Sequence, residues 1–193
     1  MTRCNVLIVD DSRTMRSIIS NALAQDPELC VVGEAGDPLE AREAIKRLNP
    51  DVVTLDIEMP KMNGLDFLER IMRLRPTPVV VISSHTERGA ETTIRALELG
   101  AVDCIGKPSM KSHDSLKELA ERVKSAAKAH VRVKSDQTGA SRKVLEGQYT
   151  SDGRIVAIGA SMGGVEALSV VLSVFPENCP PTVITQHMPP MFT

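Results

Sequence analysis

Residues 5–11 read Asn5-Val6-Leu7-Ile8-Val9-Asp10-Asp11, an apolar run that ends in two carboxylates. Four consecutive Val, Leu or Ile residues are typical of a strand that is buried on both faces of a sheet. Similar, mainly apolar runs recur at residues 29–32, 52–55, 79–82 and 102–105, and segments with helical spacing lie between them. This alternation predicts an α/β fold, a doubly wound five-stranded parallel sheet covered by helices.

The chain continues beyond this first domain, which we place at residues 1–129. Residues 130–153 are poor in apolar side chains and predict a linker. The pattern of residues 154–193 predicts a strand over 154–158, a helix over 165–172 and a strand over 182–185. Two parallel strands and one helix cannot bury both faces of a sheet, so we expect an amino-terminal fragment of a second parallel α/β domain.

Composition excludes several classes of protein. The formal net charge is −2 and the chain has three Phe, one Tyr and no Trp, which disfavours nucleic-acid binding. No apolar run approaches the length that membrane insertion requires. The four cysteines are far apart in the sequence and contain no CxxC pair, so we expect reduced thiols in a cytoplasmic protein.

Polar residues follow the strands of the first domain. Asp10 and Asp11 follow the first strand and Asp56 follows the third. In the strand order 2-1-3-4-5 these two strands are neighbours, so the three carboxylates should converge and favour Mg²⁺. Ser83 follows the fourth strand and Lys107 the fifth. A hydroxyl and an ammonium there would suit a phosphoryl group on a nucleophilic aspartate.

These motifs resemble the receiver domain of two-component response regulators, which has a flavodoxin-like fold. They are Val-Asp-Asp-Ser at 9–12, Leu-Asp-Ile-Glu-Met-Pro at 55–60, Ile-Ser-Ser at 82–84 and Gly-Lys-Pro at 106–108. The resemblance implies that Asp56 accepts the phosphoryl group and that Ser83 and Lys107 contact it. It also implies that Mg²⁺ is held by Asp10, Asp11, Asp56 and the backbone carbonyl of Glu58. Cys104 occupies the switch position, where the family often has an aromatic residue.

A second candidate site lies in the carboxyl-terminal part. Gly159-Ala160-Ser161-Met162-Gly163-Gly164 joins a strand to a helix, and His187 comes two residues after the next strand. Small residues around Ser161 allow a sharp turn that exposes a nucleophilic hydroxyl, and His187 would act as its general base. The spacing alone also fits a helix cap or a phosphate loop at Ser161, and a loop histidine at 187.

The order of these elements resembles the chemotaxis response regulator protein-glutamate methylesterase family. That resemblance implies a Mg²⁺-dependent regulator that hydrolyses glutamate methyl esters and deamidates glutamines on methyl-accepting chemoreceptors. A chemotaxis histidine kinase would phosphorylate Asp56 and so relieve a block of the catalytic cleft. Ser161 and His187 match the family's catalytic Ser and His, whereas Met162 stands where the family usually has Thr. The family's catalytic aspartate comes later than residue 193, so we expect this fragment to be inactive as an esterase.

One alternative function remains open at this stage. The chain could act as a phospho-acceptor receiver that only binds partners and carries an inert vestigial catalytic tail. A DNA-binding regulator is disfavoured because residues 150–193 contain no helix-turn-helix pattern and no basic recognition helix.

Overall fold

The structure is a computed structural model. It describes residues 3–59, 63–83, 87–108, 113–129, 131, 153–161, 163–176 and 178–187. The chain divides into two compact units, Met1–Val133 and Lys134–Thr193, which we call the first unit and the second unit. Apart from residues 131 and 153, the linker expected over 130–153 lies outside the described residues.

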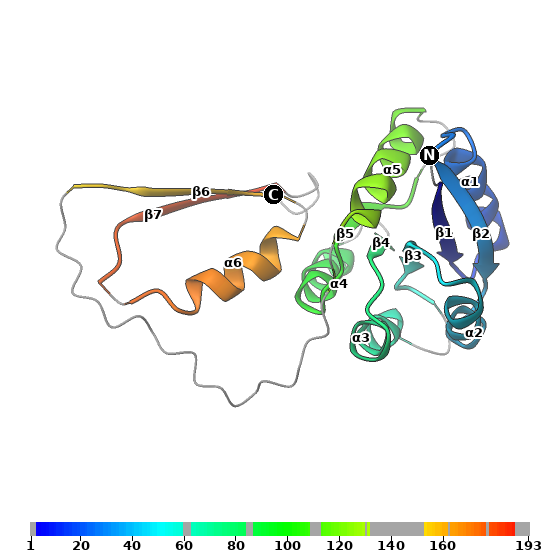
Figure 1. Ribbon diagram of the computed structural model, residues 1–193, viewed down its shortest axis with the longest axis horizontal. Coiled ribbons are helices and arrows are strands. Elements are labelled where there is room, and N and C mark those ends of the chain that lie inside the picture. The colour runs from blue at the N-terminus through cyan, green and yellow to red at the C-terminus, as the bar shows by residue number, and fades with distance from the viewer. Residues whose placement is uncertain are drawn as a thin grey trace. The chain divides into compact units, whose positions relative to one another are not determined.

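The first unit is built on one five-stranded sheet (Figure 1). All four strand pairings are parallel, and the strand order is β2-β1-β3-β4-β5. The sequence prediction of a doubly wound parallel sheet is therefore confirmed. The strands are β1 (Cys4–Val9), β2 (Leu29–Ala35), β3 (Val52–Asp56), β4 (Val79–Ser83) and β5 (Asp103–Gly106).

Helices cover both faces of this sheet because its strands are apolar on both sides. Val6 and Ile8 pack toward α1 (Arg13–Leu23) and α5 (His113–Ala127). Leu7 and Val9 pack on the opposite face. That face is covered by α2 (Pro38–Leu48), α3 (Gly64–Leu74) and α4 (Glu87–Glu98). The alternation of side chains along a strand thus produces two cores, one on each side of the sheet.

Local signals fix the ends of the first two helices. Ser12 caps α1 by accepting a hydrogen bond from the backbone N–H of Met15. Asp37 caps α2 by accepting from the two backbone N–H groups of residues 39 and 40, and Pro38 occupies the first helical turn. The carboxylate of Glu40, in the first turn of α2, accepts a hydrogen bond from the N–H of Gly36.

Strand β2 is longer than the sequence pattern predicts. The apolar run ends at residue 32, but the strand continues through Gly33 to Ala35. A Cβ added to Gly33 would lie 2.6 Å from the Leu48 side chain, so close packing against α2 explains a glycine inside this strand.

The second unit contains the predicted strand, helix and strand. They are β6 (Val156–Ala160), α6 (Gly164–Leu172) and β7 (Thr182–Gln186), and β6 and β7 are parallel. Several large apolar side chains of this unit are exposed, including Ile155 at 65% and Val183 at 59%. Among the described residues of either unit, no helix combines the length and the apolar character needed to cross a bilayer.

Candidate functional site

Three carboxylates meet at the edge of the first unit's sheet where its parallel strands end. Asp10 follows β1 directly, Asp11 comes next, and Asp56 is the last residue of β3. One oxygen from each of these carboxylates lies within 4.8 Å of those of the others. Asp10 and Asp56 are 1% exposed, whereas Asp11 is exposed. The predicted convergence of the three acids is confirmed, and its cause is the pairing of β1 with β3.

Both oxygens of Asp56 are held in place. Oδ1 accepts a hydrogen bond from the backbone N–H of Glu58 at 2.9 Å. Oδ2 accepts from the ammonium of Lys107 at 2.9 Å, and the same ammonium lies 3.6 Å from a carboxylate oxygen of Glu58. Ser83 is the last residue of β4 and is 2% exposed. Its backbone carbonyl accepts a hydrogen bond from the backbone N–H of Lys107. The strand ends therefore bring a hydroxyl and an ammonium to the same edge as Asp56.

Asp10 is the acid of this cluster whose ionised form is destabilised by its surroundings. The pKa of its carboxyl is raised from 3.8 to about 6, mainly by burial and also by the charges of Asp56 and Asp11, against the lowering effects of the Ser12 hydrogen bond and of Lys107. Its Oδ1 accepts from the N–H of Ser12 at 2.8 Å. Its Oδ2 is buried and has no hydrogen-bond partner among the described residues. A buried carboxylate oxygen is stabilised when it contacts a cation or accepts a hydrogen bond.

Burial and charge act in opposite directions on Lys107. Burial lowers the pKa of its ammonium, but the hydrogen bond to Asp56 and the nearby carboxylates outweigh this effect. The pKa therefore lies above its ordinary value, and the ammonium stays charged beside Asp56 at neutral pH.

The second unit brings Ser161 and His187 together. His187 follows β7, and its backbone N–H bonds the carbonyl of Ala160 at 2.8 Å. The Oγ of Ser161 lies 3.4 Å from Nδ1 of His187, and both residues are exposed. This contact is longer than an ordinary hydrogen bond. The predicted proximity of the two side chains is confirmed.

A turn that needs glycine exposes the Ser161 hydroxyl. Gly163 adopts a left-handed φ of 70°, and a Cβ on Gly164 would lie 2.7 Å from the Cβ of Ala160 and closer still to the Gln186 side chain. A Cβ on Gly159 would meet nothing within 4 Å. The two glycines after the serine therefore shape the turn, and the glycine before it has no such steric role. Met162 lies outside the described residues.

Two family models match the chain. Residues 6–122 match the model of the response regulator receiver domain. The chain belongs to the response regulator receiver family. Residues 156–193 match the model described as CheB methylesterase. Receiver domains generally bind Mg²⁺ at an acidic pocket, and this chain has such a cluster of aspartates.

Individual relatives match the chain beyond the receiver domain. The chain is 60% identical over 195 residues to protein-glutamate methylesterase/protein-glutamine glutaminase 1 of Caulobacter vibrioides. This match includes 100% of the chain and 57% of the relative, so the chain spans little more than half of that protein. The crystal structure of the response regulator domain of Thermotoga maritima CheB is 43% identical, with a TM-score of 0.61 over 66% of this chain and 98% of that one.

One further solved structure that this chain resembles is a complex of two partners. It is the crystal structure of the P1 domain of CheA3 in complex with CheY6 from R. sphaeroides. It is 33% identical, with a TM-score of 0.54 over 65% of this chain and 99% of that chain.

The residue at the expected switch position is buried. Cys104 lies in β5, is 2% exposed, and its thiol is 3.8 Å from the carbonyl of Thr93 in α4. Burial, with a smaller contribution from Asp103, raises the pKa of the thiol far above its ordinary value. Cys104 therefore contributes a small apolar side chain to the contact between β5 and α4.

Two residues that support the sites are absent from the sequence prediction. Arg16 of α1 donates to the carbonyl of Asp10 at 2.7 Å and pairs with Glu34 at 3.2 Å, which fixes the loop that carries the acids. The side-chain amide of Gln186 donates to the carbonyls of Ser161 and His187 at 2.8 and 2.9 Å. A polar residue directly before His187 at the end of an apolar strand was the available signal for this second one.

Proposed function

We propose that this chain is a phosphorylation-controlled regulator of chemotaxis whose first unit accepts a phosphoryl group on Asp56. The observation that carries the proposal is the arrangement around that carboxylate. It is buried, its Oδ2 bonds Lys107 at 2.9 Å, and two further acids lie within 4.8 Å. A phosphoryl-accepting aspartate needs this combination of a fixed nucleophile and nearby positive charge.

Magnesium fits the cluster. Its ligands would be carboxylate oxygens of Asp10, Asp11 and Asp56 with the backbone carbonyl of Glu58, an oxygen-only set that suits this ion. The buried Oδ2 of Asp10, which has no partner among the described residues, supports a cation at this position. When bound, the ion would neutralise charge on the phosphoryl oxygens during transfer.

The chain's own residues would carry out the transfer as follows. An oxygen of Asp56 forms a bond to phosphorus while the bond between phosphorus and the donor breaks. The N–H of Glu58 and the ammonium of Lys107 hold the carboxylate in place before the reaction. Lys107 and the hydroxyl of Ser83 then contact the phosphoryl oxygens of the product.

Labelling with a small phosphodonor tests this role. With acetyl phosphate and Mg²⁺, we expect one phosphoryl group per chain by intact mass, located at Asp56 by peptide mapping. Asp56→Asn should abolish the label, whereas Asp66→Asn, an acid in the first turn of α3, should retain it. Equal labelling of Asp56→Asn, or full labelling in excess EDTA, would refute the assignment.

We also propose that Ser161 and His187 form part of a methylesterase in a polypeptide of the relatives' length. Ser161 Oγ would attack the γ-carbonyl carbon of a glutamate methyl ester while His187 takes its proton. Methanol would leave, and water would then release the glutamate from the serine. Gln186 would act as a positioning residue, because it joins the backbones of both catalytic residues.

Methanol release by the longer polypeptide tests the esterase. Ser161→Ala should abolish it, whereas Ser169→Ala, whose hydroxyl only bonds the Val165 carbonyl within α6, should leave it unchanged. Stimulation by acetyl phosphate should disappear in Asp56→Asn. Substantial activity in Ser161→Ala would contradict the proposal, and unchanged stimulation in Asp56→Asn would contradict the regulatory link.

The partners follow from the same proposal. A chemotaxis histidine kinase would supply the phosphoryl group, in keeping with the kinase P1 domain bound to a related receiver. The name of the Caulobacter relative specifies glutamate methyl esters of a protein as its substrates, and methyl-accepting chemoreceptors would supply such esters here. We place the chain in the cytoplasm, where it would meet both partners.

A further inference from the structure

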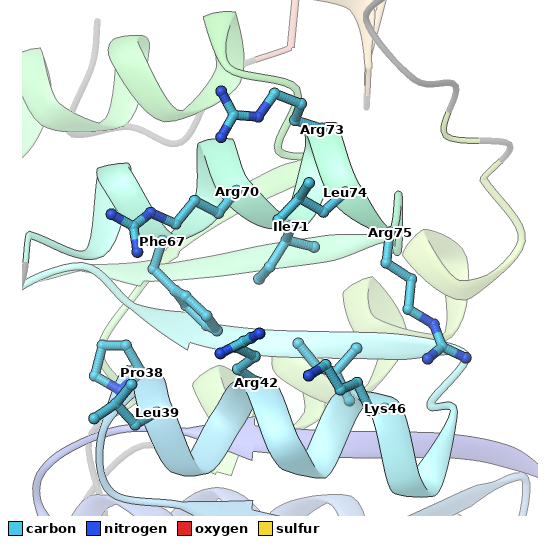
Figure 2. A pocket seen from close by; sticks show the side chains of 11 residues that line it. Pro38, Leu39, Arg42, Lys46, Phe67, Arg70, Ile71, Arg73, Leu74 and Arg75 are labelled. Carbon is cyan, nitrogen blue, oxygen red and sulfur yellow. The ribbon is translucent and has the colours of Figure 1, made fainter.

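A groove between α2 and α3 lies on the first unit, lined by residues that neither proposed site uses. It has a volume of about 610 Å³. Figure 2 shows Phe67 and Ile71 pointing from α3 toward α2, while Arg42 and Lys46 point from α2 into the space between the helices. Phe67 and Ile71 are 5% exposed and form an apolar floor.

The rims of this α2–α3 groove carry exposed apolar side chains. Leu39 near the start of α2 is 67% exposed, and Leu74 at the end of α3 is 72% exposed. Figure 2 shows them at opposite ends of the groove. They are the two most exposed large apolar side chains of the described residues. A segment that lies along the groove could cover both leucines at once.

The groove is also strongly basic. Its lining includes five cationic residues and no Asp or Glu: Arg42, Lys46, Arg70, Arg73 and Arg75. Lys46 pairs with Glu43, and Arg75 donates to Asn49. The guanidinium groups of Arg42, Arg70 and Arg73 make no ion pair or hydrogen bond among the described residues. This concentration of positive charge contrasts with a chain whose net charge is −2.

We propose that the α2–α3 groove binds an acidic amphipathic segment of a partner protein, most simply as a helix. Its apolar face would contact the floor and the two leucines, and its carboxylates would pair with the three uncommitted arginines. An amphipathic helix in a groove between two helices is a recurrent mode of recognition, and complementary charge gives it specificity.

Other occupants fit these observations less well. A bilayer surface is flat and could not reach Phe67 or Ile71 beneath the basic side chains. A single-stranded nucleic acid would stack its bases on exposed aromatic side chains, and Phe67, the one aromatic in the lining, is 5% exposed. The phosphate backbone of a duplex would leave the apolar floor and the two exposed leucines without apolar partners.

A designed peptide provides the probe. It is a fluorescent, helix-forming peptide with Leu on one face and Glu on the other, titrated into the full chain and followed by anisotropy. We expect saturable binding that weakens as salt is raised, and amide shifts centred on α2 and α3 in an isotope-labelled chain. A peptide with Lys in place of Glu should bind roughly tenfold more weakly or not at all.

Matched variants locate the site. Arg42→Glu or Arg70→Glu should weaken binding roughly tenfold, and Leu39→Ala or Leu74→Ala by about threefold. Arg47→Glu, an exposed cation of α2 outside the groove lining, should change the affinity less than about twofold. All these side chains are exposed, so circular dichroism should report unchanged folding.

The following results would overturn the proposal. If Arg47→Glu weakens peptide binding as much as Arg42→Glu does, the peptide is held by overall charge and not by this groove. Shifts outside α2 and α3 would indicate another site. Vesicles of anionic phospholipid that bind through Arg42 and Leu39, while the peptide does not, would assign the groove to membranes. Self-association that disappears in Arg42→Glu would assign it to a second copy of the chain.

Discussion

The buried carboxyl of Asp10 lowers the stability of the first unit whenever it is ionised. Burial raises its pKa from 3.8 to about 6, and the residue is 1% exposed. One pKa unit corresponds to about 1.4 kcal/mol, so the whole shift corresponds to about 3 kcal/mol at neutral pH. Asp11 in the same cluster is exposed, so water reaches the cluster and reduces the free-energy cost of ionising Asp10. We therefore expect a cost of about 1 to 2 kcal/mol without metal.

The pH dependence has a definite sign. Because the folded pKa of Asp10 lies above the unfolded value, its contribution to stability is fully present below pH 3.8 and is lost as the pH rises through about 6. Asp10→Asn removes this charge and can keep the hydrogen bond from Ser12. The variant should therefore gain about 1 to 2 kcal/mol at pH 7 in EDTA. Mg²⁺ should stabilise the unchanged protein and not the variant.

Hydrogen exchange is the suitable assay, because the chain has no Trp and contains two compact units. Slowly exchanging amides of β1 and β3 report the opening of the first unit alone. Asp11→Asn serves as the control, since it removes an exposed charge from the same cluster and should change stability by less than about 0.5 kcal/mol. A loss of stability in Asp10→Asn at pH 7 without metal would refute this reasoning.

Three further predictions follow from the packing. Gly64→Ala should destabilise the first unit by about 2 to 4 kcal/mol in urea unfolding, because its Cβ would overlap the backbone of Ile57, whereas Gly159→Ala should be tolerated. Asn49→Ala should cost about 1 kcal/mol, since φ is 45° there, and Asn49→Gly should cost less than half of this in the same assay. Cys104 should resist iodoacetamide in the native protein, as peptide mass mapping would show, because burial raises its pKa and only 2% of the residue is exposed.

The strands and the acidic cluster could be predicted because each depends on short stretches of sequence. A strand buried on both faces is apolar throughout, and the residue after it must lie at the carboxyl edge of the sheet. The order of β1 and β3 then brings Asp10 and Asp56 together. The capping of α2 by Asp37 was equally local.

Features that depend on tertiary packing could not be predicted in the same way. The extension of β2 through Gly33 depends on the position of the Leu48 side chain. The role of Arg16 depends on α1 lying against the loop at Asp10, and the α2–α3 groove depends on how two separate helices pack. A glycine or an arginine in the sequence does not reveal these neighbours.

The two candidate sites lie at equivalent ends of parallel strands but are held in place by different means. Asp10 and Asp56 adjoin strands whose apolar side chains are almost fully buried, so a change in their geometry requires disruption of the core. Ser161 and His187 are exposed, and the side chain of Gln186 bonds the carbonyls of both. The N–H of His187 bonds the carbonyl of the neighbouring Ala160. Such bonds contribute only about 1 kcal/mol each. The first unit alone can therefore hold the geometry that we propose for phosphoryl transfer, whereas precise alignment of the serine and histidine requires additional packing over β6 and β7.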